Sequence, residues 1–222
     1  MTFSILVYDK ESESFGGASA TGNLCVGGWV LRGDSRYGIS ASQGSEPSTI
    51  WGEDVIENLK KGLTATDAVN QMVKSDIGRE KRQLSVIDSK GNGYAFSGSK
   101  NNAIVSQIIG SNIVLSGNLL SSKDVLLGMQ TTFSKARGEL SEKLLECLNA
   151  GALLGGDRRG LQSASILVLN NKKPPISLRV DHDPNPLDKL SKLLELSRES
   201  EYATWMSSLP TRQYPRKTRE EP

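Results

Sequence analysis

The chain has 222 residues, which fits one α/β domain or two small ones and is enough to bury a substantial core. Hydrophobic residues make up 36% and charged residues 23%, which is ordinary for a soluble globular protein. The net charge of +2 is too small to indicate nucleic-acid or membrane binding. We interpret a basic, proline-containing stretch near the C-terminus as a solvated tail; it contains Arg212, Arg216, Lys217 and Arg219.

In chain order, residues 2–8 predict a strand, and residues 15–30 predict two strands with a bend near Gly22 and Asn23. Residues 33–36 predict a turn, and residues 37–42 predict a further strand. Two helices are expected at 47–61 and 64–75, because their apolar residues share one face. Thr64 and Thr66 are the candidates to cap the second helix.

The second half alternates between hairpins and pairs of helices. Residues 84–98 and 103–116 each predict a β-hairpin, and residues 123–135 and 139–150 predict helices. Strands are expected at 163–169 and 176–180, followed by a last clear helix at 187–199. This order predicts an α+β protein in which two antiparallel sheets pack face to face with helical layers outside. We expect one domain over residues 1–197 and a peripheral C-terminal extension over 198–222.

The two cysteines, Cys25 and Cys147, lie far apart and lack the spacing of a metal or redox motif. One disulfide could not hold together a fold of this size, so we interpret both cysteines as packed thiols in a reducing compartment. The start of the chain does not have the pattern of a secretion signal, and its apolar runs are too short to cross a bilayer. We therefore predict a cytoplasmic protein with no nucleic-acid and no membrane partner.

A loop rich in glycine and arginine, LGGDRRGLQSAS at residues 154–165, runs directly into the apolar segment 166–169. Its glycines permit a tight turn and close approach of another group. Arg158 and Arg159 offer rigid forks of donors that suit a carboxylate, and Asp157 can orient them. The loop is thus a candidate ligand site, and the alternative is an internal Arg–Asp pair that fixes a turn.

Thr2 is the first candidate for covalent chemistry. Methionine before a small residue is commonly removed, which would give Thr2 a free α-amine. An amine with a pKa near neutrality can take the proton of the neighbouring hydroxyl and so activate it as a nucleophile. The alternative is that Thr2 merely starts an edge strand.

Five segments of the chain resemble the domain-of-unknown-function 1028 family: TFSI (2–5), REKRQL (79–84), GN (117–118), GGDRRGLQSA (155–164) and LRVDHD (178–183). The resemblance spans about residues 2–197. It implies the fold of the N-terminal-nucleophile (Ntn) hydrolases, a four-layer αββα sandwich, which agrees with the element order above. It does not supply a settled substrate or an agreed catalytic set.

If the chemistry of those hydrolases applies, the resemblance implies that Thr2 attacks the carbonyl of a small amide or amino-acid conjugate. The side-chain amide of Asn118, or a backbone N–H beside it, would stabilise the oxyanion. Arg158 or Arg159 would bind a substrate carboxylate, and Gln43 is a further candidate at the rim of the pocket. Each of these residues also has an alternative role in stabilising a turn.

Two features limit the chemistry. The sequence has no lysine between Lys10 and Lys60, and arginine cannot act as a proton shuttle, which argues against proteasome-like peptidase action. His182, the single histidine, lies between Asp181 and Asp183 and suggests a metal or acid–base site. We favour a surface turn there and predict no cofactor, with magnesium left open.

Three classes of function therefore compete. The first is a hydrolase with an N-terminal threonine that acts on a small-molecule substrate. The second is a non-catalytic, Ntn-like scaffold that binds a small molecule, and the third is a subunit of a homo-oligomer.

Overall fold

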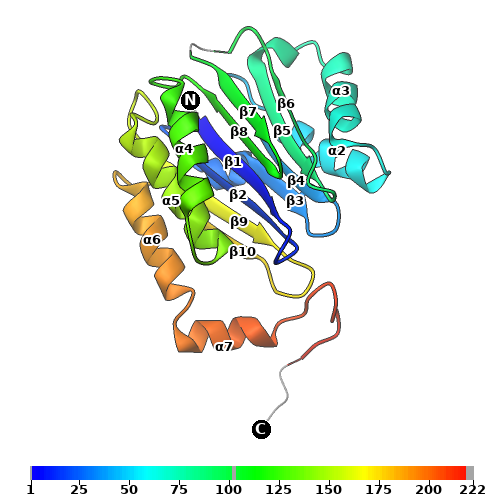
Figure 1. Ribbon diagram of the computed structural model, residues 1–222, viewed down its shortest axis with the longest axis vertical. Coiled ribbons are helices and arrows are strands. Elements are labelled where there is room, and N and C mark those ends of the chain that lie inside the picture. The colour runs from blue at the N-terminus through cyan, green and yellow to red at the C-terminus, as the bar shows by residue number, and fades with distance from the viewer. Residues whose placement is uncertain (1, 102–103, 219–222) are drawn as a thin grey trace.

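The computed structural model describes residues 2–101 and 104–218, and within them the strands form two antiparallel sheets (Figure 1). The order in the six-stranded sheet is β10-β9-β2-β1-β8-β7, and in the four-stranded sheet it is β3-β4-β5-β6. The larger sheet contains β1 (Thr2–Asp9), β2 (Ser14–Thr21), β7 (Ser106–Gly110), β8 (Ile113–Asn118), β9 (Ser163–Leu169) and β10 (Ile176–Val180). The smaller contains β3 (Leu31–Asp34), β4 (Gly38–Gly44), β5 (Arg82–Asp88) and β6 (Gly93–Ser97).

Helices cover the outer face of each sheet (Figure 1). The larger sheet is covered by α4 (Asp124–Lys135), α5 (Leu140–Leu153) and α6 (Pro186–Leu196), and the smaller by α2 (Thr49–Lys60) and α3 (Ala65–Ser75). The short elements are α1 (Val26–Trp29), the 3-10 turn η1 (Arg79–Lys81) and α7 (Ser200–Ser208). The predicted four-layer αββα sandwich is therefore confirmed.

Strand β1 shows why the layers form. Its odd-numbered residues Phe3, Ile5 and Val7 belong to the core beneath α4 and α5, whereas Leu6 belongs to the core between the sheets. This alternation follows from the two-residue period of a strand, which sends successive side chains to opposite faces. A third core lies between the smaller sheet and helices α2 and α3.

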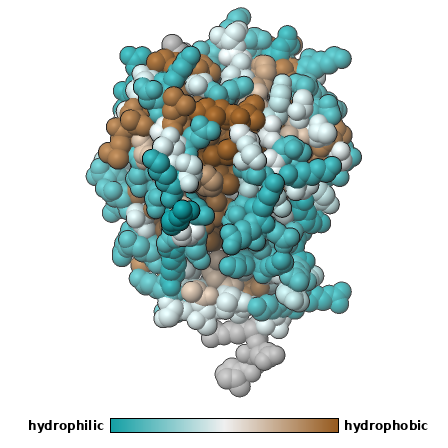
Figure 2. Space-filling model, in the orientation of Figure 1, coloured by the Kyte–Doolittle hydropathy of each residue, from teal (hydrophilic) through white to brown (hydrophobic). Residues whose placement is uncertain are grey.

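Hydrophobic surface is visible on the face that carries α4 and β7 (Figure 2). Figure 2 shows brown surface in the upper half of the face on which α4 and β7 lie. Ile108 and Leu119 are partly buried and pack against the core of the larger sheet, whereas Leu127 of α4 is exposed.

The segment between β2 and β4 differs from the sequence-based prediction. Residues 15–30 form one strand and a single helical turn, not two strands. Residues 31–34 form β3, so the turn expected at 33–36 begins only after Asp34. The helical turn packs closely on β9 and β10, because a Cβ at Gly27 would lie 2.7 Å from Arg179 and 2.8 Å from Ser165. Two glycines that break a strand pattern thus mark a close tertiary contact, which the sequence alone does not reveal.

Most of the other predicted elements are confirmed with small shifts. Thr64 is the N-cap of α3, since its hydroxyl accepts a hydrogen bond from the Asp67 amide at 3.2 Å. The helix expected at 187–199 is α6, which ends at Leu196. Helix α7, which follows it, was not predicted. The start of the strand expected at residue 103 lies outside the described residues, and β7 begins at Ser106.

Within residues 2–101 and 104–218, no helix combines the length and apolar character that a bilayer span requires.

Close packing between β2 and α5 leads to a prediction for Gly16→Val. A Cβ at Gly16 would lie 2.8 Å from Leu140 and 2.9 Å from Leu144, so a larger side chain must push the helix away. We expect a loss of about 1–3 kcal/mol in the free energy of unfolding, measured by urea denaturation. Ser177→Val, at an exposed position of β10, is the control and should be nearly neutral. Equal stability of the two variants would contradict the packing described here.

Candidate functional site

The layer between the two sheets changes from apolar to polar along its length. At one end it contains apolar side chains such as Leu6, Phe15 and Ile39. At the other end the buried side chains are hydroxyls and amides: Ser4, Ser19, Thr21, Gln43, Gln83, Ser85, Ser116, Asn118, Ser163 and Ser165. We call this second set the polar end. Buried polar groups must find partners to be tolerated, so its hydrogen bonds fix the geometry there.

Thr2 lies at the polar end, at the start of a central strand. β1 pairs with β2 on one side and with β8 on the other, which places Thr2 opposite Thr21 and Asn118. The alternative that Thr2 starts an edge strand is therefore wrong. Its hydroxyl donates to Thr21 Oγ1 at 3.2 Å, and its carbonyl accepts from Gln43 Nε2 at 3.3 Å. Half-buried Thr2 is thus held from both sheets, through its hydroxyl by the larger and through its carbonyl by the smaller.

Gln83 is the centre of the hydrogen-bond network behind Thr2. Its carbonyl Oε1 accepts from Gln43 Nε2 at 2.7 Å and from Asn118 Nδ2 at 3.3 Å. Its Nε2 donates to Ser97 Oγ at 2.8 Å and to the Gly117 carbonyl of the other sheet at 3.2 Å. One side chain from the smaller sheet therefore fixes Asn118 on the larger.

Gln43 is fully buried, in the wall of this network, although the sequence suggested a place at the rim of a pocket. Its Oε1 accepts from Ser4 Oγ at 2.8 Å, so it too joins the two sheets. A buried amide with both ends bonded restrains its neighbours firmly. Gln43 thus supports the backbone at Thr2.

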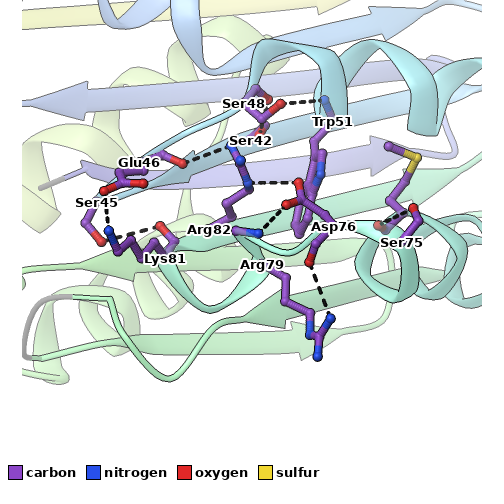
Figure 3. A network of polar contacts seen from close by, with 12 residues as sticks. Ser42, Ser45, Glu46, Ser48, Trp51, Ser75, Asp76, Arg79, Lys81 and Arg82 are labelled. Carbon is purple, nitrogen blue, oxygen red and sulfur yellow. Dashed lines mark hydrogen bonds and ion pairs between the residues drawn. The ribbon is translucent and has the colours of Figure 1, made fainter.

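A second polar network holds the ends of β4 and β5, where Gln43 and Gln83 lie (Figure 3). The guanidinium of Arg82 lies 2.9 Å from Asp76 and donates to the Glu46 carbonyl at 3.2 Å. It also lies over the ring of Trp51, 5.7 Å from the centroid. The segment REKRQL singled out in the sequence therefore anchors the loops beside the polar end.

Asp157 ties the glycine- and arginine-rich loop to the same region. Its fully buried carboxylate accepts from the Gly22 amide at 2.6 Å and from Arg159 Nε and Nη2 at 3.1 and 3.0 Å. Its backbone pairs with Leu120. Gly22 follows β2 and Leu120 follows β8, the two neighbours of β1, so Asp157 restrains both strand ends that flank Thr2.

The internal Arg–Asp pair considered from the sequence is therefore present. Arg159 remains 45% exposed while it holds Asp157, and Arg158 is exposed on the same loop. The structure thus brings Thr2, Asn118 and Gln43 into one network and connects Asp157 to it through Gly22. A ligand-binding role for either arginine stays a prediction.

His182 lies in an exposed turn after β10. Asp181 beside it pairs with Arg179 at 2.9 Å, and Asp183 accepts from the Asn185 amide at 2.8 Å. Among the described residues, no three His, Cys, Asp or Glu side chains gather closely enough to hold a metal ion. The two carboxylates at His182 are thus engaged in local structure.

The cysteines differ in exposure. Cys147 is buried, and desolvation raises the pKa of its thiol to about 12, with the charge of Glu146 acting in the same direction. A thiol held in this state is a poor nucleophile. Cys25 is partly exposed and has a left-handed backbone, with φ of 58°.

Sequence reasoning missed Thr21, Gln83 and Ser4 as members of the site. A signal was available, because polar residues recur two positions apart at strand ends, as in Thr2 with Ser4 and Ser116 with Asn118. That spacing places them on one face of a strand. It does not reveal which strands are neighbours, and the site depends on that.

Together, these features define a four-layer αββα sandwich with a threonine at the start of a central strand. The chain belongs to DUF1028, a family of unknown function whose model matches residues 2–190. The crystal structure of protein SPO2555 from Silicibacter pomeroyi, a DUF1028 protein, is 42% identical and matches with a TM-score of 0.93. The match covers 98% of both chains.

A weaker similarity is found to Anbu (ancestral beta-subunit) from Yersinia bercovieri. The two chains are 10% identical, with a TM-score of 0.42 and coverage of 91% of this chain and 97% of the other. No curated protein matches the sequence.

Gln83→Ala tests the network behind Thr2. Removal of this side chain takes away the acceptor that the buried amides of Gln43 and Asn118 share, so we expect a loss of about 2–3 kcal/mol in the free energy of unfolding. Gln71→Ala, at an exposed position of α3, is the matched control and should change stability little. Similar denaturation midpoints for both variants would refute the role given to Gln83.

Asp157→Asn tests the anchor of the arginine loop. The variant retains the shape of the side chain but weakens the bonds from Gly22 and Arg159, so we expect it to destabilise the protein by about 1–3 kcal/mol. Asp181→Asn removes the carboxylate from an exposed pair with Arg179 and should cost at most about 1 kcal/mol. Thermal unfolding of both variants would decide, and a smaller effect at Asp157 than at Asp181 would count against the anchor.

Proposed function

We propose that the protein is an Ntn amide hydrolase that acts on a small amide or amino-acid conjugate, with Thr2 as the nucleophile after removal of Met1. The observation that carries this proposal is the position of Thr2. Half-buried Thr2 begins a central strand at the polar end, where its hydroxyl donates to Thr21 and its carbonyl accepts from the Gln43 amide. A rigidly held nucleophile with nearby donors is what acyl transfer requires.

In this mechanism the α-amine of Thr2 takes the proton of its own hydroxyl as Oγ1 attacks the carbonyl carbon. The tetrahedral intermediate collapses to an ester on Thr2, and the leaving amine departs with the proton from the α-ammonium group. Water, activated by the same amine, then attacks the ester, releases the acid product and restores the hydroxyl. No other general base is needed.

Asn118 would stabilise the oxyanion. Its Nδ2 carries two hydrogens and donates one to Gln83 Oε1, which leaves the other for a substrate oxygen. Because Gln83 is bonded on both sides, the amide would be held in place before the substrate arrives. Gln43 would act as a positioning residue through the carbonyl of Thr2.

Arg159 and Arg158 would bind a substrate carboxylate. The pair with Asp157 holds the guanidinium of Arg159 in one orientation, and nearly half of this side chain is exposed. A fixed fork of donors loses little entropy when it binds a carboxylate. In this proposal Asp157 orients the arginine, residues 1–197 form the catalytic unit and residues 198–222 are peripheral. The free cysteines suit a reducing compartment such as the cytoplasm.

The second candidate function is a non-catalytic scaffold that binds a small molecule or assembles into an oligomer. It is favoured by the number of site groups that already have partners inside the protein. Arg159 is paired with Asp157, and Gln43 and Gln83 are bonded at both ends of their amides. Under this alternative the polar end stabilises the sandwich and performs no chemistry.

Intact-mass analysis and Thr2 variants distinguish the two candidates. We expect the native protein to lack one methionine residue and to turn over members of a panel of N-acyl amino acids and small amides. Thr2→Ala should lower turnover by about a thousand-fold or more, and Thr2→Ser should retain part of it. Thr66→Ala, at an exposed position of α3, is the matched control and should keep full activity. Retained methionine, or unchanged turnover in Thr2→Ala, would exclude Thr2 as an amine-assisted nucleophile.

A further inference from the structure

A cavity of about 410 Å³ lies at the end of the sandwich opposite Thr2. Its walls come from α7, from the end of α6, and from the segment that leads from β9 into β10. Figure 1 shows α7 crossing below the lower end of the larger sheet, far from the N-terminus. A volume of this size is typical of small-molecule sites.

The segments on either side of helix α7 attach it to the rest of the protein. Before the helix, Arg198 pairs with Glu139 at 3.0 Å and with Glu142 at 2.6 Å. After it, the Gln213 amide donates to the Asn171 carbonyl at 2.9 Å. Between these points none of the nine helical residues is buried. A helix normally gains its stability by burying one face, and the inner face of α7 is only partly buried, at Ala203 and Met206.

The lining of the cavity is apolar with basic groups near it. Pro174, Ile176 and Leu178 form the wall on the sheet side, Leu194 comes from α6, and Ala203 and Met206 come from α7. Lys172, Lys173 and Lys217 also contribute. The acidic residue among the lining groups, Glu139, is already paired with Arg198, and Lys172 pairs with Glu13 at 2.7 Å. Positive charge therefore exceeds negative charge at an apolar cavity.

We propose that this cavity binds a single-chain alkyl carboxylate, with the chain between α7 and the sheet and the carboxylate beside Lys173. An alkyl chain would add apolar contacts to the partly buried inner face of α7, at about 0.8 kcal/mol for each buried methylene group. The excess of lysines favours an anionic head over a neutral one. The site is separate from Thr2 and independent of the proposed hydrolase function.

The test is calorimetric titration of the full chain with decanoate and, separately, with decanol. We expect saturable binding of decanoate with one molecule per chain, and binding of decanol at least about tenfold weaker. Equal affinity for the two ligands would overturn the role of the lysines. The absence of saturable decanoate binding would overturn the site.

Two pairs of variants locate the site. Ala203→Trp places a ring in the cavity and should abolish binding, whereas Thr204→Trp adds the same ring at the exposed neighbouring position and should not. Lys173→Glu should weaken decanoate binding by about tenfold, whereas Lys90→Glu, in the exposed turn between β5 and β6, should leave it unchanged. Melting temperatures show whether each variant is folded. If Ala203→Trp destabilises the chain, the lysine pair still tests the proposal.

Two further measurements separate this proposal from other outcomes. Thr2→Ala should bind decanoate as the unchanged protein does, so a failure of the hydrolase proposal leaves this one intact. Light scattering gives the oligomeric state with and without decanoate. A dimer that Ala203→Trp dissociates would identify the cavity as a contact between two copies and would overturn the ligand site.

Discussion

The side-chain amide of Gln83 is the interaction on which the polar end of the sandwich depends. It accepts from Gln43 and Asn118 and donates to Ser97 and the Gly117 carbonyl, so both sheets converge on it. A buried amide without a hydrogen-bond partner would lower the free energy of unfolding by about 1–3 kcal/mol. Each neighbouring group that lost its bond to Gln83 would add a cost of the same order. These bonds therefore fix the position of one sheet relative to the other beside Thr2.

Asp157 extends this restraint from the interior to the surface. Its buried carboxylate holds Gly22, at the end of β2, and the guanidinium of Arg159, which is partly exposed to solvent. The pair of Arg159 with Asp157 stabilises the loop, and it also fixes the guanidinium of Arg159 beside the segments that flank Thr2. A structural role and a binding role for this loop are thus compatible, because one face of the arginine stabilises the fold and the other meets solvent.

The two ends of the molecule have opposite chemistry. At the Thr2 end, hydroxyls and amides fill the space between the sheets and bond to one another. At the other end, α7 is held by Arg198 and by the backbone of Gln213, with an apolar cavity beneath it. The polar end is rigid because its groups are satisfied, whereas the cavity is poorly packed, and poor packing is what a ligand can remedy.

The sequence by itself determined the layers, because strand alternation and helical periodicity assign each side chain to a face, as Phe3, Ile5 and Leu6 illustrate. It also identified Thr2, Asn118, Gln43 and Asp157 as candidates, from their chemical type and from the family they resemble. It failed at residues 26–30, where the contact of Gly27 with Arg179 overrides the local strand pattern. Only the tertiary structure decided that β1 is central and that Gln83 joins Asn118 to Gln43, because strand order and contacts across the two sheets are set by long-range packing, which leaves no local signature.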